Sequence, residues 1–112
     1  MAVQDQGKSS LGLEANVAAL FSYLLGFITG IIFYVLEKEN KFVRFHAMQS
    51  IVTFGAFFVV SIALGIFPFV GWILINLLSI ASVILWVLLM IKAYNGEYFK
   101  LPVAGDIAEK NS

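Results

Sequence analysis

The sequence predicts an all-α integral membrane protein with three transmembrane helices, short connections and a candidate interfacial segment at its C-terminal end. Two observations carry this prediction. The chain of 112 residues is 61% hydrophobic and only 12% charged, whereas a soluble domain carries roughly 25% charged residues. Three apolar stretches, at about residues 13–36, 45–66 and 71–92, each reach the roughly 20 residues that a helix needs to cross a hydrocarbon core.

The first two expected helices have recognisable ends. Residues 1–12 are mostly polar and form the expected flexible N-terminal tail. Glu14 falls in the first turn of the first helix, where a carboxylate interacts favourably with the helix dipole. The charged segment 37–44 separates this helix from the second one. Pro68 ends the second helix because proline removes an amide donor.

The third helix follows a short uncharged turn and ends near Asn95 and Gly96, which are common residues after a helix C-terminus. Together the three spans form one transmembrane domain over residues 13–94. Residues 95–112 form a cytoplasmic or interfacial tail, in which Pro102 and Gly105 argue against a continued straight helix.

Lysine and arginine residues are distributed unevenly along the chain. With three spans, the segment 37–44 and the C-terminal tail share one side of the membrane. That side carries six of the seven cations, and only Lys8 lies on the other. Because cations near helix ends favour the cytoplasmic side, we expect a multi-pass protein of the cell (inner) membrane. Its C-terminus is expected in the cytoplasm and its N-terminus outside.

The composition excludes several classes of function. A formal net charge of zero gives no basis for nucleic-acid binding. The absence of cysteine removes disulfides and thiolate ligands. No nucleophile–base pair can be assembled from the sequence. The carboxylates nearest to His46, Glu37 and Glu39, lie beyond the cations Lys41 and Arg44, so a hydrogen-bonding role at the membrane boundary is favoured over a metal ligand. We therefore expect no enzyme activity, no cofactor and no metal site. The expected partners are the lipid bilayer and either further copies of the chain or other membrane proteins.

Two glycines mark a helix-packing face in the first apolar stretch. Gly26 and Gly30 form a GxxxG motif, which lets another helix backbone approach closely. They belong to a stripe with 3–4 spacing that contains Asn16, Ala19, Tyr23, Gly26, Gly30 and Phe33. Two interpretations remain open: an interface between copies of the chain, or packing against this chain's own second or third helix.

Hydroxyl side chains recur in the second and third stretches, and they also have two interpretations. Ser50, Thr53, Ser79 and Ser82 would face water in a narrow solute path. Alternatively, they bond to carbonyls of their own or neighbouring helices. We favour packing, because no buried carboxylate, lysine or arginine accompanies them, and such residues usually mark ion and proton paths.

A candidate interaction cluster lies at the start of the second helix and contains Arg44, His46 and Gln49. His46 and Gln49 are three residues apart and therefore share a helix face. One hypothesis is that this cluster holds the tail around residues 98–105 against the membrane boundary. The alternative is that all three side chains extend into water and headgroups.

The segment Glu-Lys-Glu-Asn-Lys-Phe-Val-Arg-Phe-His-Ala-Met-Gln-Ser at residues 37–50 resembles the signature of a family of small prokaryotic multi-pass membrane proteins. The resemblance also implies a relation to the Tic20 component of the chloroplast import machinery. Residues 98–106 resemble the family's C-terminal ending. The resemblance implies a multi-pass inner-membrane protein and does not imply a mechanism.

The predicted function is therefore a helix-packing or assembly component of a membrane complex. The alternative is a subunit of a small oligomeric channel or transporter, because three helices of this size cannot enclose a path without further copies.

Overall fold

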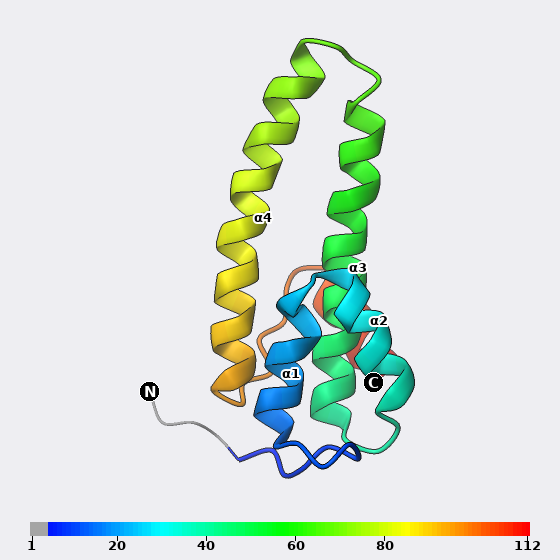
Figure 1. The fold of residues 1–112 in the computed structure, drawn as a ribbon, viewed down its shortest axis with the longest axis vertical. Helices are drawn as coiled ribbons and strands as arrows, with labels where there is room; N and C mark the ends of the chain where they lie inside the picture. Colours follow the sequence, from blue (N-terminus) through cyan, green and yellow to red (C-terminus); the bar gives the residue numbers. More distant parts are fainter. Residues whose placement is uncertain (1–4) are drawn as a thin grey trace.

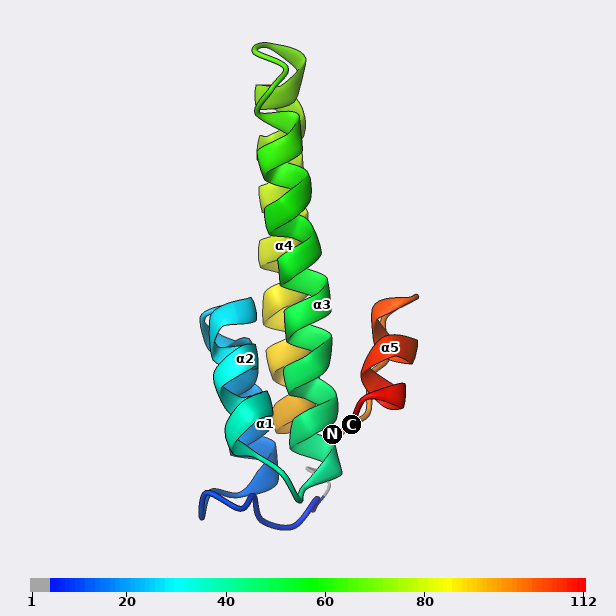
Figure 2. The same ribbon diagram turned by 90° about the vertical axis from the view of Figure 1, so that its right-hand side faces the viewer.

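The computed structural model describes residues 5–112, and this part of the chain forms five α-helices and no β-strand. In chain order the helices are α1 (Ala15–Leu24), α2 (Phe27–Leu36), α3 (Lys41–Leu64), α4 (Val70–Tyr94) and α5 (Ala104–Lys110). α3 and α4 form a long antiparallel pair, and the three short helices lie beside its lower half (Figures 1 and 2). The all-α prediction is confirmed. The prediction of three spans is wrong, because within residues 5–112 only α3 and α4 are long and apolar enough to cross a membrane.

The first apolar stretch is divided, which corrects the single span predicted over residues 13–36. α1 and α2 contain 10 residues each, and α2 runs back toward the end where α1 began (Figure 1). Gly26 lies at the reversal with φ of 64°, a left-handed conformation that glycine adopts at little cost. Thr29 Oγ1 accepts a hydrogen bond from the Leu25 N–H at 3.0 Å, so the exposed backbone of the turn has a partner.

α3 begins at Lys41 rather than at the predicted residue 45, because Asn40 caps it. The side-chain oxygen of Asn40 accepts from the N–H groups of Phe42 and Val43 at 3.0 and 3.2 Å. α3 has 24 residues and α4 has 25, so each is about 36 Å long and exceeds a hydrocarbon core of about 30 Å. Pro68 lies in the turn between them, as predicted.

The hydrophobic core lies at the lower end of the molecule in Figure 1, where α1 packs between α3 and α4. Small side chains on α1 let the three helices approach closely. The fully buried members are Ala15, Ala18, Ala19, Tyr23, Phe42, Val43, Leu89 and Ala93. All of them belong to α1 or to the halves of α3 and α4 beside it, so the upper halves of the long helices stand free of the core.

All charged residues of the chain lie at the same end as the core, because residues 45–91 contain none. The N-terminal segment also contacts this end. Asn40 Nδ2 donates to the carbonyl oxygens of Gln6 and Lys8, both at 3.0 Å. This contact corrects the prediction that Lys8 and the segment 37–44 lie on opposite sides. Of the predicted tail over residues 1–12, residues 1–4 lie outside the described part.

The C-terminal segment folds back onto α3. After α4 the chain runs without regular structure to residue 103 and then forms α5, which packs against α3. Gly105 is needed for this return, since a Cβ there would lie 2.6 Å from the Lys100 Cβ. The predicted C-terminal segment is therefore a short helix attached to the lower half of α3 (Figure 2).

Candidate functional site

A buried polar cluster joins α1 to α3, and we define it as Tyr23, His46 and Gln49. All three side chains are fully buried. Tyr23 Oη lies 2.6 Å from His46 Nδ1 and accepts a hydrogen bond from Gln49 Nε2 at 3.0 Å. His46 Nε2 lies 2.8 Å from the main-chain oxygen of Glu97, just beyond α4. The polar cluster therefore connects the first short helix, the first long helix and the segment after α4.

One arrangement of protons satisfies every bond of the cluster. The Glu97 carbonyl can only accept, so Nε2 of His46 carries a proton. In the neutral ring Nδ1 then accepts the hydroxyl proton of Tyr23, whose oxygen accepts from Gln49. The donors run in one direction, from Gln49 through Tyr23 and His46 to Glu97. Because each member has its partner, the cluster fixes the relative positions of the three segments.

Gln49 also holds the chain on both sides of Lys100. Its Nε2 donates to the carbonyl oxygen of Phe99 at 2.8 Å, and its Oε1 accepts from the Leu101 N–H at 2.9 Å. A single amide thereby pairs with two backbone groups that have no helical partners. Together with the bond from His46 to Glu97, these contacts fasten the segment 97–101 to α3.

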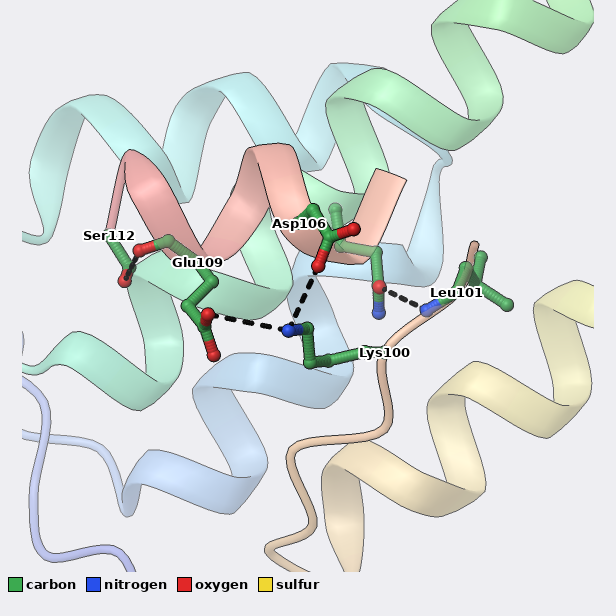
Figure 3. Close-up of polar contacts among 6 residues, drawn as sticks. Lys100, Leu101, Asp106, Glu109 and Ser112 are labelled. Atoms are coloured by element: carbon green, nitrogen blue, oxygen red, sulfur yellow. Dashed lines mark hydrogen bonds and ion pairs between the residues drawn. The ribbon is translucent and has the colours of Figure 1, made fainter. Parts of the chain in front are cut away.

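α5 holds the same segment through Lys100. Figure 3 shows the Lys100 ammonium between the carboxylates of Asp106 and Glu109, at 3.0 and 3.3 Å. The hydrogen bonds to Asp106 and Glu109 raise the pKa of Lys100. Because these side chains are exposed, their ion pairs are screened by water and add little stability. The buried amide of Gln49 is the stronger attachment.

Arg44 lies apart from His46 and Gln49. Its Nη1 donates to the carbonyl oxygens of Tyr34 and Glu37 at 3.0 and 2.6 Å, at the C-terminal end of α2. The guanidinium stacks on the Tyr34 ring, 4.1 Å from its centroid. The last carbonyls of a helix have no N–H partner within that helix, and the Arg44 guanidinium donates to two of them here. The structure thus divides the predicted cluster: His46 and Gln49 contact the segment 97–101, and Arg44 caps α2.

Gly26 and Gly30 both contact α3 of the same chain. A Cβ at Gly30 would lie 2.9 Å from the Ala47 carbonyl oxygen and 3.0 Å from the Ser50 Cβ. The Gly26 carbonyl accepts from Ser50 Oγ at 2.8 Å. Gly30 is therefore a site of close helix approach, while Gly26 forms the turn before α2. Of the two interpretations of the GxxxG motif, this geometry corresponds to packing within the chain.

A second buried site centres on Glu37, which the sequence pattern did not single out. The carboxylate is fully buried between α2 and α3. It accepts from the Ser10 N–H and hydroxyl at 2.8 and 2.7 Å. It also accepts from the N–H groups of Glu39 and Asn40 at 3.2 and 3.0 Å. Burial by itself raises the pKa of this carboxyl, but the hydrogen bonds from Asn40, Ser10 and Glu39 together outweigh burial and lower it.

The lowered pKa of Glu37 makes the stability of the protein sensitive to acid. A carboxyl with a depressed folded-state pKa stabilises the fold above its unfolded-state pKa, and this contribution is lost as the pH falls through the folded-state pKa. We expect acidification below the ordinary value of 4.5 to lower the melting temperature of the wild type more than that of Glu37→Gln, as followed by tryptophan fluorescence in detergent micelles. Glu39→Gln is the control, since Glu39 is exposed. Equal acid sensitivity in the wild type and Glu37→Gln would contradict this assignment.

Two further polar contacts of the first stretch could not be identified from the sequence. Asn16 Nδ2 donates to the Tyr94 carbonyl at 3.0 Å, and Trp86 Nε1 donates to the Tyr23 carbonyl at 2.6 Å. The 3–4 spacing indicates that Asn16 and Tyr23 lie on the same helix face as the two glycines, and it is the one sequence signal for these contacts. Their partners lie more than 60 residues away in the sequence, so spacing alone does not identify them.

Within residues 5–112, no group of three or more His, Cys, Asp or Glu side chains is arranged to hold a metal ion.

The geometry defines a class of protein: a small all-helical protein with two helices long and apolar enough to span a membrane, a short helical hairpin and one charged end. The chain belongs to the family described as the magnetosome magnetite crystal formation protein family, whose model matches residues 8–108. No solved structure matches the chain significantly.

Two archaeal relatives support the same assignment. A UPF0132 membrane protein of Methanocaldococcus jannaschii is 58% identical over 106 residues, covering 95% of this chain and 96% of the relative. A UPF0132 membrane protein of Archaeoglobus fulgidus is 52% identical over 98 residues, covering 88% of this chain and 95% of the relative. The expected membership of a family of small prokaryotic membrane proteins is confirmed. The matches give no support for the expected relation to Tic20.

Proposed function

We propose that this protein lies in the cell membrane with its charged end in the cytoplasm and the turn at residues 65–69 outside. All seven cations of the chain lie at the charged end, and cations near helix ends favour the cytoplasmic side. In this orientation both the N-terminal segment and α5 face the cytoplasm. The bias is seven cations against none, which is stronger than the six against one expected from three spans.

The hairpin of α1 and α2 then enters only the cytoplasmic half of the membrane. Each of its helices has 10 residues and is about 15 Å long, half the thickness of a hydrocarbon core. A chain reversal inside lipid needs partners for its backbone. The hydroxyls of Thr29 and Ser50 supply them, through bonds with the Leu25 N–H and the Gly26 carbonyl.

In this setting the protein acts as an assembly component, whose long helices pack sideways against other membrane helices. One observation carries this proposal. Only Gly71, Leu89 and Ala93 of the 25 residues of α4 are buried, so the rest of this helix offers an apolar surface to its surroundings. α4 is therefore available for lateral contacts along most of its length.

A channel or transporter subunit is the rival function, and the hydroxyl residues do not favour it. Ser50 and Thr53 are buried, whereas Ser79 is exposed on α4. Ser82 Oγ bonds back to the Ser79 carbonyl at 2.9 Å. Residues divided between buried and exposed positions do not form one water-facing lining.

Cysteine labelling tests the proposed orientation, because the chain contains no cysteine. Lys8→Cys, Glu39→Cys and Asn111→Cys are expected to react with an impermeant thiol reagent only after the cells are permeabilised. Phe67→Cys, in the turn between α3 and α4, is expected to react in intact cells. Labelling of Lys8→Cys from outside with protection of Glu39→Cys would restore the three-span model. Labelling of all three from outside would invert the orientation.

Photocrosslinking in the native membrane tests the assembly role. A photoreactive residue at Ile84, which is 65% exposed on α4, is expected to form a discrete adduct with another protein chain. The matched position is Leu89 on the same helix, which is fully buried and is expected to form none. Lipid adducts alone at Ile84, or solute flux through reconstituted liposomes above that of empty ones, would overturn the assembly role.

A further inference from the structure

We propose that a hollow beside the C-terminal end of α2 binds the phosphate group of an anionic phospholipid. The hollow has a volume of about 530 Å³ and is lined by Tyr34, Val35, Lys38, Arg44 and Ser112. This volume falls in the ordinary range of ligand sites, about 300–1,000 Å³. The inference rests on the proposed placement of the charged end at a membrane boundary.

The cationic side chains of the hollow have unused donors. Arg44 has five N–H donors, of which the two on Nη1 bond to the Tyr34 and Glu37 carbonyls. Within residues 5–112, its other donors and the ammonium of Lys38 have no hydrogen-bond or ion-pair partner. The stack on Tyr34 fixes the plane of the guanidinium. A fixed planar fork beside a second cation suits the tetrahedral oxygens of a phosphate group.

No aspartate or glutamate side chain lines the hollow. The Glu37 carboxylate points instead toward Ser10 and the N–H groups of Glu39 and Asn40. The other wall is formed by Ser112, whose hydroxyl donates to the Glu109 carbonyl at 3.1 Å. The lining of the hollow therefore contains two cationic side chains and no acidic side chain.

The outer face of α2 indicates a lipid rather than a free phosphate. Ile28, Ile31, Ile32 and Val35 recur with 3–4 spacing, and each is at least 45% exposed. This apolar face leads along α2 to the hollow, so a headgroup bound by Lys38 and Arg44 would have its acyl chains beside these side chains. Basic hollows between helices at the cytoplasmic boundary are a recurrent form of lipid headgroup site.

Native mass spectrometry of the purified protein in neutral detergent tests the site without relying on its orientation in a cell. We expect phosphatidylglycerol to stay bound and phosphatidylcholine with the same acyl chains to dissociate. Lys38→Gln should lower the affinity for phosphatidylglycerol about fivefold, in line with the loss of one cation near a headgroup. Lys41→Gln is the matched control, because Lys41 is an exposed lysine three residues away that does not line the hollow. The affinity of the Lys41→Gln variant for phosphatidylglycerol should change less than twofold.

If Lys38→Gln and Lys41→Gln lower the affinity for phosphatidylglycerol equally, the binding depends on general surface charge, and the proposed site is wrong. Equal binding of the two lipids to the wild type would also overturn it. An excess of inorganic phosphate should leave the lipid in place, and complete displacement would assign the hollow to free phosphate instead. If the cysteine labels invert the orientation while the micelle result holds, the proposed orientation fails and the phosphate site stands.

Discussion

Gly30→Leu is expected to separate the α1–α2 hairpin from α3 and to destabilise the protein by about 3 kcal/mol, the upper end of ordinary overpacking costs. A single added Cβ would already lie 2.9 Å from the Ala47 carbonyl oxygen and 3.0 Å from the Ser50 Cβ. The obstacle is partly backbone of a continuous helix, so it cannot rotate away as a flexible side chain would. α2 must move outward, and the bond from Ser50 to the Gly26 carbonyl should be lost with it.

The melting temperature in detergent micelles measures this effect, and Gly55→Leu provides the control. Gly55 also lies within a helix, α3, but a Cβ there meets no atom within 4 Å. We therefore expect Gly55→Leu to fold with wild-type stability, since leucine is suited to a lipid-facing position. Equal melting temperatures for the two leucine variants would show that the close approach of α2 to α3 is not a determinant of stability.

The two long helices could be predicted from composition, whereas the hairpin could not. Length and hydropathy identify residues that prefer lipid, and by that criterion residues 13–36 match a spanning helix. The criterion does not distinguish one helix that crosses the membrane from two short helices that enter half of the membrane and return to the same side. Two residues determine that the chain reverses. Gly26 adopts the left-handed conformation of the turn, and the Thr29 hydroxyl accepts a hydrogen bond from the Leu25 N–H within it. Glycine and threonine are common in spanning helices, so neither residue alone signals a break.

The site residues were predicted in part for a similar reason. Helical spacing places His46 and Gln49 on one face of α3, but their partners are reached only through the tertiary fold. Tyr23 is 23 residues from His46 in the sequence, and Leu101 is 52 residues from Gln49. Arg44 is close to both in sequence yet points to the end of α2. Sequence patterns thus indicate which face of α3 is polar, and the paths of α2 and of the C-terminal segment determine what each side chain binds.

Gln49→Leu is expected to release the segment 97–101 from α3 and to destabilise the protein by about 3 kcal/mol. Leucine has nearly the volume of glutamine, so packing is preserved while the bonds are lost. The carbonyl of Phe99 and the N–H of Leu101 lose their partner, and each unpaired group that stays buried costs about 1–3 kcal/mol. Tyr23 loses the donor to its hydroxyl in the same step.

Hydrogen exchange at the Leu101 amide gives the local measurement, because this N–H donates directly to Gln49. Its exchange should accelerate strongly in Gln49→Leu, while amides in the upper half of α4 keep their wild-type rates. Asn76→Leu is the matched control: it also replaces an amide by leucine, but Asn76 is exposed and bonds to Trp72 of its own helix at 2.8 Å. That variant should leave both the Leu101 exchange rate and the melting temperature unchanged. If Gln49→Leu exchanges as slowly at Leu101 as the wild type, the exposed ion pairs of Lys100 hold the segment, and the buried amide does not.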